Sequence, residues 1–338
     1  MPKLIFFGLI AGFFFSSTFV LNEVMAMAGG QWFWSASGRY VFMWLILSIV
    51  ILLKNGVGVF CGLIKLYQQH LPFWSVAGGV GFGGFYAFLC FGADHAPAWV
   101  IAATFQFTVV ASLIVMKCFG ETISPKAIIA SLVVFFGVLL ANVGEGLHGG
   151  NTHGLGTLLL FGALPALVAG FCFPIGNQLV WYATHPKAMS HAANSNPNSN
   201  ANSNSTPTSA FITHIPHITS PLMASPLHKV WLLTTGSLPA WLVLGVVLHP
   251  APPSVSQVVN TFLVALFAGV IATSIFIYAR TKAANSGQLA GIDATQASEV
   301  IFAMIGGMLL LGTPMPSTLS LVGIGLVVLG LVGFAMVG

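Results

Sequence analysis

The chain has 338 residues, of which 57% are hydrophobic and only 5% are charged. A soluble domain carries about 25% charged residues, so this composition excludes a water-soluble protein. The net charge of +4 comes from cations that stand singly between apolar runs, a spacing that excludes a nucleic-acid-binding patch. We therefore expect a membrane protein, with lipid as a partner and no nucleic acid.

Ten apolar runs follow one another along the chain, each close to the roughly 20 residues that a membrane-spanning helix needs. The runs cover residues 4–22, 33–53, 72–91, 98–117, 125–143, 155–183, 229–248, 258–280, 288–311 and 318–337. The first run is also compatible with a signal peptide, but its polar residues and its later counterpart favour a transmembrane helix. The sequence thus predicts an all-α integral membrane fold of about ten transmembrane helices.

The cations predict how this bundle is oriented. If the N-terminus lies in the cytoplasm, every Lys and Arg except Arg39 falls in a cytoplasmic loop, while the opposite loops contain none. Cytoplasmic loops carry an excess of cations in membrane proteins. The pattern therefore favours ten helices with both termini on the cytoplasmic side.

The chain also repeats itself. Residues 73–140 overlay residues 266–333 without a gap, so that Gln106 meets Glu299, and the first helices align Asn22 with Asn177. Five helices per half is an odd number, so the second half must be inverted, as in many secondary transporters. We expect one half over 1–145 and the other over 152–338, interrupted by a disordered Asn/Ser-rich cytoplasmic loop at about 185–228.

The fourth and fifth runs carry the clearest motif. ATFQFTVVASLIVMKCFGETISPKAIIASLVVFFGVLL has Glu121 at its hairpin and Gly137 sixteen residues later, and DATQASEVIFAMIGGMLLLGTPMPSTLSLVGIGLVVLG opens on a polar stretch. The chain resembles the drug/metabolite transporter superfamily of EamA-like ten-helix exporters, and is most similar there to the multidrug resistance efflux transporter family. Its second hairpin departs from the pattern, with Pro314 where the module often has an acid.

This resemblance implies a secondary transporter, usually an exporter, with a central cavity between the halves. We expect a multi-pass protein of the bacterial plasma membrane, a monomer or homodimer without a cofactor, that moves a small-molecule substrate. No nucleophile elbow, HExxH or paired acidic motif is present, so neither an enzyme nor a metal site is expected. A channel and a non-transporting scaffold are weaker alternatives.

The ninth helix has a polar face, which cannot point at lipid. It comprises Asp293, Thr295, Gln296 and Glu299. A buried carboxyl group that stays close to neutral can exchange its proton for a cationic substrate. We therefore take Glu299 as the coupling carboxylate of a proton-coupled exporter, with Asp293 on its entry route. The alternative is that Glu299 pairs permanently with Arg39 or Gln106.

Three further polar residues are candidates for the cavity. Arg39 lies inside the second helix, where it would hold the carboxylate or phosphate of an anionic substrate or extend to the outer interface. Asn22 and Asn177 occupy matching positions and are too polar to face lipid unpaired. The leading hypothesis is export of hydrophobic or cationic molecules in exchange for protons. The alternative is export of amino acids or other metabolites.

Overall fold

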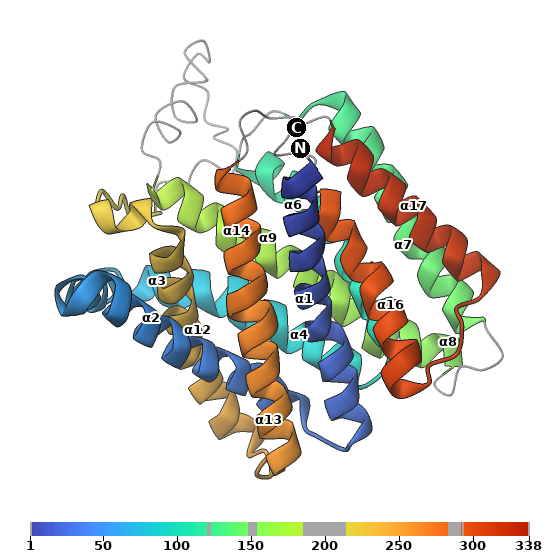
Figure 1. The fold of residues 1–338 in the computed structure, drawn as a ribbon, viewed down its shortest axis with the longest axis horizontal. Helices are drawn as coiled ribbons and strands as arrows, with labels where there is room; N and C mark the ends of the chain where they lie inside the picture. Colours follow the sequence, from blue (N-terminus) through green and yellow to red (C-terminus); the bar gives the residue numbers. More distant parts are fainter. Residues whose placement is uncertain are drawn as a thin grey trace, which may run out of the picture.

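A computed structural model describes residues 2–119, 123–147, 154–184, 214–282, 292 and 294–336. These residues form a bundle of helices without a strand (Figure 1). Glu121, Asp293 and the Asn/Ser-rich centre of the long loop lie outside the described residues. The all-α fold expected from the apolar runs is confirmed.

The first half of the chain has five helical segments, two of which are divided into shorter helices. Its helices are α1 (Pro2–Met27), α2 (Trp32–Gln69), α3 (Leu71–Gly78), the π-helix η1 (Gly79–Gly84), α4 (Phe85–Ala93), α5 (Ala98–Phe105), α6 (Thr108–Cys118) and α7 (Pro125–Gly146).

The described residues of the second half also form five helical segments. Its helices are α8 (Gly154–Thr157), the π-helix η2 (Leu158–Ala163), α9 (Leu164–Thr184), the 3-10 helix η3 (Pro221–Ala224), α12 (Pro226–Leu248), α13 (Val255–Val264), the π-helix η4 (Ala265–Ala272), α14 (Thr273–Thr281), the 3-10 helix η5 (Thr295–Ala297), α16 (Ser298–Leu311) and α17 (Thr318–Ala335).

Eight of these helical segments are long and apolar enough to cross a membrane, and two shorter apolar helices cover Thr295–Leu311 and Thr318–Gly333. Each of the ten predicted runs therefore coincides with a helical segment in the part of the chain that is described. The second segment differs most from its prediction, because α2 continues beyond residue 53 to Gln69. Gly56 bends it with a φ of 81°, a left-handed conformation that glycine adopts without a Cβ penalty.

The two halves pack against each other reciprocally. In the first half, α1 contacts α14 and α16, which belong to the third and fourth segments of the second half. In the second half, α9 contacts α4 and α6, the corresponding segments of the first half. The second helices of the two halves, α2 and α12, also contact each other. The first segment of each half therefore packs against the third and fourth segments of the other half. Two related halves would produce this pattern.

The last helices of the two halves, α7 and α17, lie side by side (Figure 1). Their backbones approach closely because glycines face the contact: a Cβ at Gly137 would lie 2.6 Å from the Val327 nitrogen. Ser317 and Ser320 add hydrogen bonds from their hydroxyls to the carbonyl oxygens of Gly144, at 3.0 Å, and Ala141, at 3.2 Å. Small residues and hydroxyl bonds of this kind hold helices together in lipid, where the hydrophobic effect does not.

Residues 214–225, within the loop predicted at about 185–228, are described by the structure. Among the described residues that precede α12, the side chains of Ile215, Ile218 and Met223 are buried. The Ile218 backbone nitrogen donates to the Ala183 carbonyl oxygen at 2.8 Å. These apolar side chains pack on the bundle, and α12 already begins at Pro226. The part of the predicted loop that the structure describes is therefore packed on the bundle.

Candidate functional site

A cavity of about 470 Å³ lies between the two halves. Its walls are mostly aromatic, with nine Phe, Tyr and Trp side chains contributed by both halves. The long polar side chains among its walls are Arg39, Gln106, Asn177, Lys229, Gln296 and Glu299. An apolar cavity with a few polar groups is the usual form of a small-molecule site.

The cavity extends towards the end of the bundle that carries both termini. Trp181, near the end of α9, and Pro226, the first residue of α12, both line it. The α1–α2 and α12–α13 turns lie at the opposite end of the bundle, away from the two termini (Figure 1). There the Gln257 amide donates to the Gln31 carbonyl oxygen at 2.7 Å and to the Ser35 hydroxyl at 3.0 Å. These bonds join the two halves and close that end.

Glu299 lies in the first turn of α16, where η5 gives way to the α-helix. Its side chain is buried and lines the cavity. Neither a hydrogen bond nor an ion pair joins it to another described residue, so the fixed pairs predicted with Arg39 and Gln106 do not form there. Gln296 lines the same cavity, whereas Thr295 is buried against Gly8 of α1. The polar face therefore divides between the cavity and helix packing.

Gln106 and Glu299, matched in the sequence repeat, are also matched in their surroundings. Gln106 follows α5 directly, at the break that separates it from α6. Glu299 follows the η5 turn that precedes α16. Both side chains line the cavity. Interrupted helices near the middle of the membrane are typical of transporter binding sites, so this pairing supports the predicted location.

Arg39 is buried beside two tyrosine rings. Its guanidinium carbon lies 4.1 Å from the centre of the Tyr86 ring and 5.9 Å from that of Tyr40. The buried Nε and Nη1 atoms find no hydrogen-bond partner in the described part of the chain. Arg39 lines the cavity. Of the two predicted alternatives, extension to the outer interface is therefore not the one that the structure describes.

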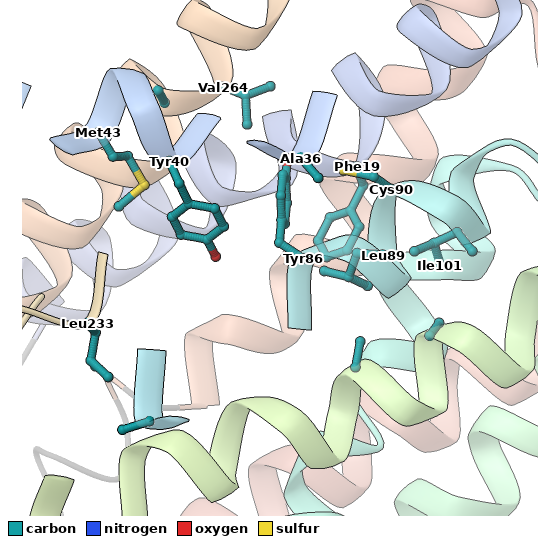
Figure 2. Packing of buried hydrophobic residues seen from close by; sticks show 14 of the residues in the cluster. Phe19, Ala36, Tyr40, Met43, Tyr86, Leu89, Cys90, Ile101, Leu233 and Val264 are labelled. Atoms are coloured by element: carbon teal, nitrogen blue, oxygen red, sulfur yellow. The ribbon is translucent and has the colours of Figure 1, made fainter. Parts of the chain in front are cut away.

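The two matched asparagines have different surroundings. Asn177 of α9 is exposed and lines the cavity. Asn22 of α1 is buried and accepts a hydrogen bond from the Tyr86 hydroxyl at 3.1 Å. Asn22 was expected at the cavity, but it is not among the residues that line it. Its hydrogen bond instead holds the Tyr86 ring, which contacts the Arg39 guanidinium. Figure 2 shows Tyr86 and Tyr40 within the packed centre of the bundle.

Glu23 is a buried acid near the C-terminal end of α1. It belongs to α1, and its Oε2 atom accepts a hydrogen bond from the Ala98 backbone nitrogen at 2.7 Å. Ala98 begins α5, and a carboxylate stabilises the free N–H groups at a helix N-terminus. In the sequence, Pro97 indicates that a helix begins there, but it does not indicate which side chain caps that helix.

A bundle of apolar helices around a central, partly polar cavity defines this protein as a membrane protein of the transporter class. Comparison with known families agrees: the model of the EmrE family, "Putative multidrug resistance efflux transporter", matches residues 2–338. The chain belongs to this family of membrane efflux transporters, and the resemblance inferred from the sequence is confirmed.

Two curated relatives are similar along most of their length. "Uncharacterized protein YjlA" of Bacillus subtilis (strain 168) is 30% identical, over 97% of this chain and 93% of the relative. "Uncharacterized 42.1 kDa protein in intracellular alkaline protease 3'region" of Shouchella clausii is also 30% identical, over 88% of this chain and 70% of that protein. A solved structure described as "Crystal structure of protein" has a TM-score of 0.54 at 15% identity, over 98% and 96% of the two chains. That last likeness concerns the fold alone.

Proposed function

We propose that this protein is a proton-coupled exporter of hydrophobic or cationic small molecules, with Glu299 as the residue that binds proton and substrate in turn. The observation that carries the proposal is the position of Glu299: it is buried, it lines the cavity, and it has no bonding partner among the described residues. A carboxylate within a membrane is costly and usually has a functional role.

The walls of the cavity support a cationic or hydrophobic substrate. Phe85 lies 5.2 Å from both Phe105 and Phe173, measured between ring centres, and all three line the cavity. Aromatic faces attract cations and provide apolar contact for a hydrophobic body. A single acid among aromatic rings would therefore bind either an organic cation or a proton, and competition between the two is the basis of antiport.

The arrangement of the halves supports transport by alternating access. The cavity extends to the end with the termini, while hydrogen bonds from Gln257 close the opposite end. Rocking of two inverted halves would open the closed end and close the open one. We propose that the two five-helix halves are inverted repeats and that the protein works in the cell membrane.

Inside-out vesicles with a preset pH gradient test this mechanism. Hydrophobic cations should collapse the gradient in the native protein, and Glu299→Gln should abolish the effect because an amide cannot exchange a proton. Glu23→Gln is the matched control, since it removes a buried carboxylate that does not line the cavity. If labelled cations cross the membrane equally with native protein and Glu299→Gln, without movement of protons, Glu299 is structural and the mechanism is wrong.

One observation favours a second candidate, export of amino acids or other metabolites. Arg39 lines the same cavity, and a guanidinium binds carboxylates by paired hydrogen bonds. Neutral amino acids belong in the same vesicle panel. Collapse of the gradient by amino acids alone would favour this candidate.

A further inference from the structure

We infer that the preferred substrates of the cavity are aromatic zwitterions, whose anionic group binds at Arg39 while their cationic group binds at Glu299. This inference rests on the proposed function, because it treats the cavity as the transport site. It specifies the substrate of that transport site as a molecule that carries both an amine and a carboxylate on an aromatic body.

The first step of the argument is the state of the guanidinium. The Arg39 side chain is only 8% exposed, yet no acidic side chain forms an ion pair with it among the residues that the structure describes. Its Nε and Nη1 atoms are fully buried. Arg39 nevertheless lines the cavity. A buried charge without a partner is unfavourable, so the site is suited to an anion supplied by a ligand.

The second step is how Arg39 is held. Its guanidinium lies over the Tyr86 ring, and the Tyr86 hydroxyl is fixed by its bond to Asn22. Tyr40, the second ring beside the guanidinium, stacks on Trp241 with ring centres 6.0 Å apart. Aromatic rings position a guanidinium through cation–π contact without neutralising its charge. The positive charge of Arg39 therefore remains available to a ligand.

The third step is the presence of the opposite charge in the same cavity. Glu299 comes from α16 and Arg39 from α2, and no ion pair joins them within the described residues. A purely cationic molecule would neutralise Glu299 but leave Arg39 unpaired, and an anion would do the reverse. A zwitterion neutralises both charges at once, while the Phe85, Phe105 and Phe173 rings contact its aromatic body.

A pair of dyes tests this charge pattern. Rhodamine 110 is a zwitterion, and rhodamine 123 is its methyl ester and carries only the positive charge. Binding of each dye to the purified full chain, in neutral detergent with phosphatidylcholine, is followed by fluorescence anisotropy. We expect the native protein to bind rhodamine 110 at least about tenfold more tightly than rhodamine 123, because an interaction between buried opposite charges is worth this much or more.

Three variants make the test specific. Arg39→Gln should remove the preference for rhodamine 110 while rhodamine 123 still binds, which also shows that the variant is folded. Arg39→Lys should keep part of the preference, because the charge remains but the planar fork is lost. Lys54→Gln is the matched control, since it removes an exposed cation from the same helix, and should change neither affinity.

The outcomes separate this inference from the proposed function. If Arg39→Gln leaves the ratio of the two affinities unchanged, the zwitterion site is wrong even when Glu299→Gln abolishes proton exchange. If Glu299→Gln has no effect on proton exchange but Arg39→Gln still removes the preference for rhodamine 110, the coupling role of Glu299 is wrong and the zwitterion site stands. If added phosphatidylglycerol removes the preference of the native protein, Arg39 binds a lipid phosphate, and the inference is overturned.

Discussion

At the scale of single residues, several buried polar side chains have local hydrogen-bond partners. The Glu23 carboxylate caps α5, and the Tyr86 hydroxyl is bonded to Asn22. Asn142 of α7 exchanges hydrogen bonds with the Thr104 hydroxyl of α5 at 2.8 and 3.2 Å. Glu299 and Arg39, two charged residues that line the cavity, form no ion pair within the described part of the chain. Because charges without an opposite charge nearby are costly in lipid, these two residues are functional candidates.

Asp94 makes a prediction about pH. It lies in the turn between α4 and α5, outside the membrane-spanning segments. Burial raises the pKa of the Asp94 carboxyl to about 6, although the charge of nearby His95 opposes the rise. The folded protein therefore favours the protonated acid, so stability should fall as the pH rises from about 4, the pKa of an unfolded Asp, to about 6.

The measurement is the thermal unfolding midpoint of the purified protein in detergent, taken across this pH range. In Asp94→Asn the amide stays neutral, so the part of the pH dependence that comes from Asp94 should disappear. A midpoint that falls by the same amount in native protein and variant would contradict the assignment of this titration to Asp94.

At the scale of helices, glycine positions decide which pairs can approach closely. The contact of α7 with α17 is the clearest case, because the backbone atoms of Gly323 and Val327 would lie 2.8 and 2.6 Å from a Cβ at Gly137. Backbone atoms cannot move aside as a flexible side chain can. The glycine is therefore required by packing and not by its own helical conformation.

Gly137→Ala should consequently destabilise the protein, by about 1–3 kcal/mol as for other overpacked contacts. Gly325→Ala is the matched control on α17: that glycine is exposed, and nothing lies within 4 Å of its Cβ position. Alanine is the better helix former, so the control should be neutral or slightly stabilising. Unfolding midpoints in detergent compare the two variants. Equal midpoints would show that α7 and α17 do not pack as closely as described.

At the scale of the whole molecule, the two halves meet around the cavity and are joined at its closed end. The Gln257 side chain of α13 bonds to two groups at the start of α2, on the other half of the chain. Alternating access requires such bonds to break whenever the cavity opens to that side. Their strength should therefore set how often the closed end opens.

Gln257→Ala should raise access to the cavity from the side opposite the termini. Two lost hydrogen bonds are worth about 2 kcal/mol, enough for a rise of about tenfold or more in the open population. The reporter is Leu89→Cys, a buried cavity residue, in a chain without its four native cysteines. Its labelling rate with an impermeant maleimide gives the access. Asn260→Ala is the control, because Asn260 bonds only within α13 to Ser256 among the described residues.

The positions of the helices and the polar face of the ninth segment could be predicted from the sequence. The ten helical segments could be predicted because lipid requires a minimum length and an almost uniform apolarity, and both are visible in the chain itself. The polar face with Gln296 and Glu299 was visible for the same reason, since charge stands out against an apolar background. The proposed division into halves and the roles of the site residues stay predictions.

Other features depended on which helix faces meet, and a single sequence carries no such information. Only the tertiary structure placed Tyr86 against Arg39, separated Asn22 from the cavity, and directed Glu23 to the start of α5. The sequence by itself determined the class of protein and the positions of its helices, because the solvent imposes them. The tertiary structure alone decided which buried charges are neutralised by neighbours and which face the cavity, because that depends on contacts between residues far apart in the chain.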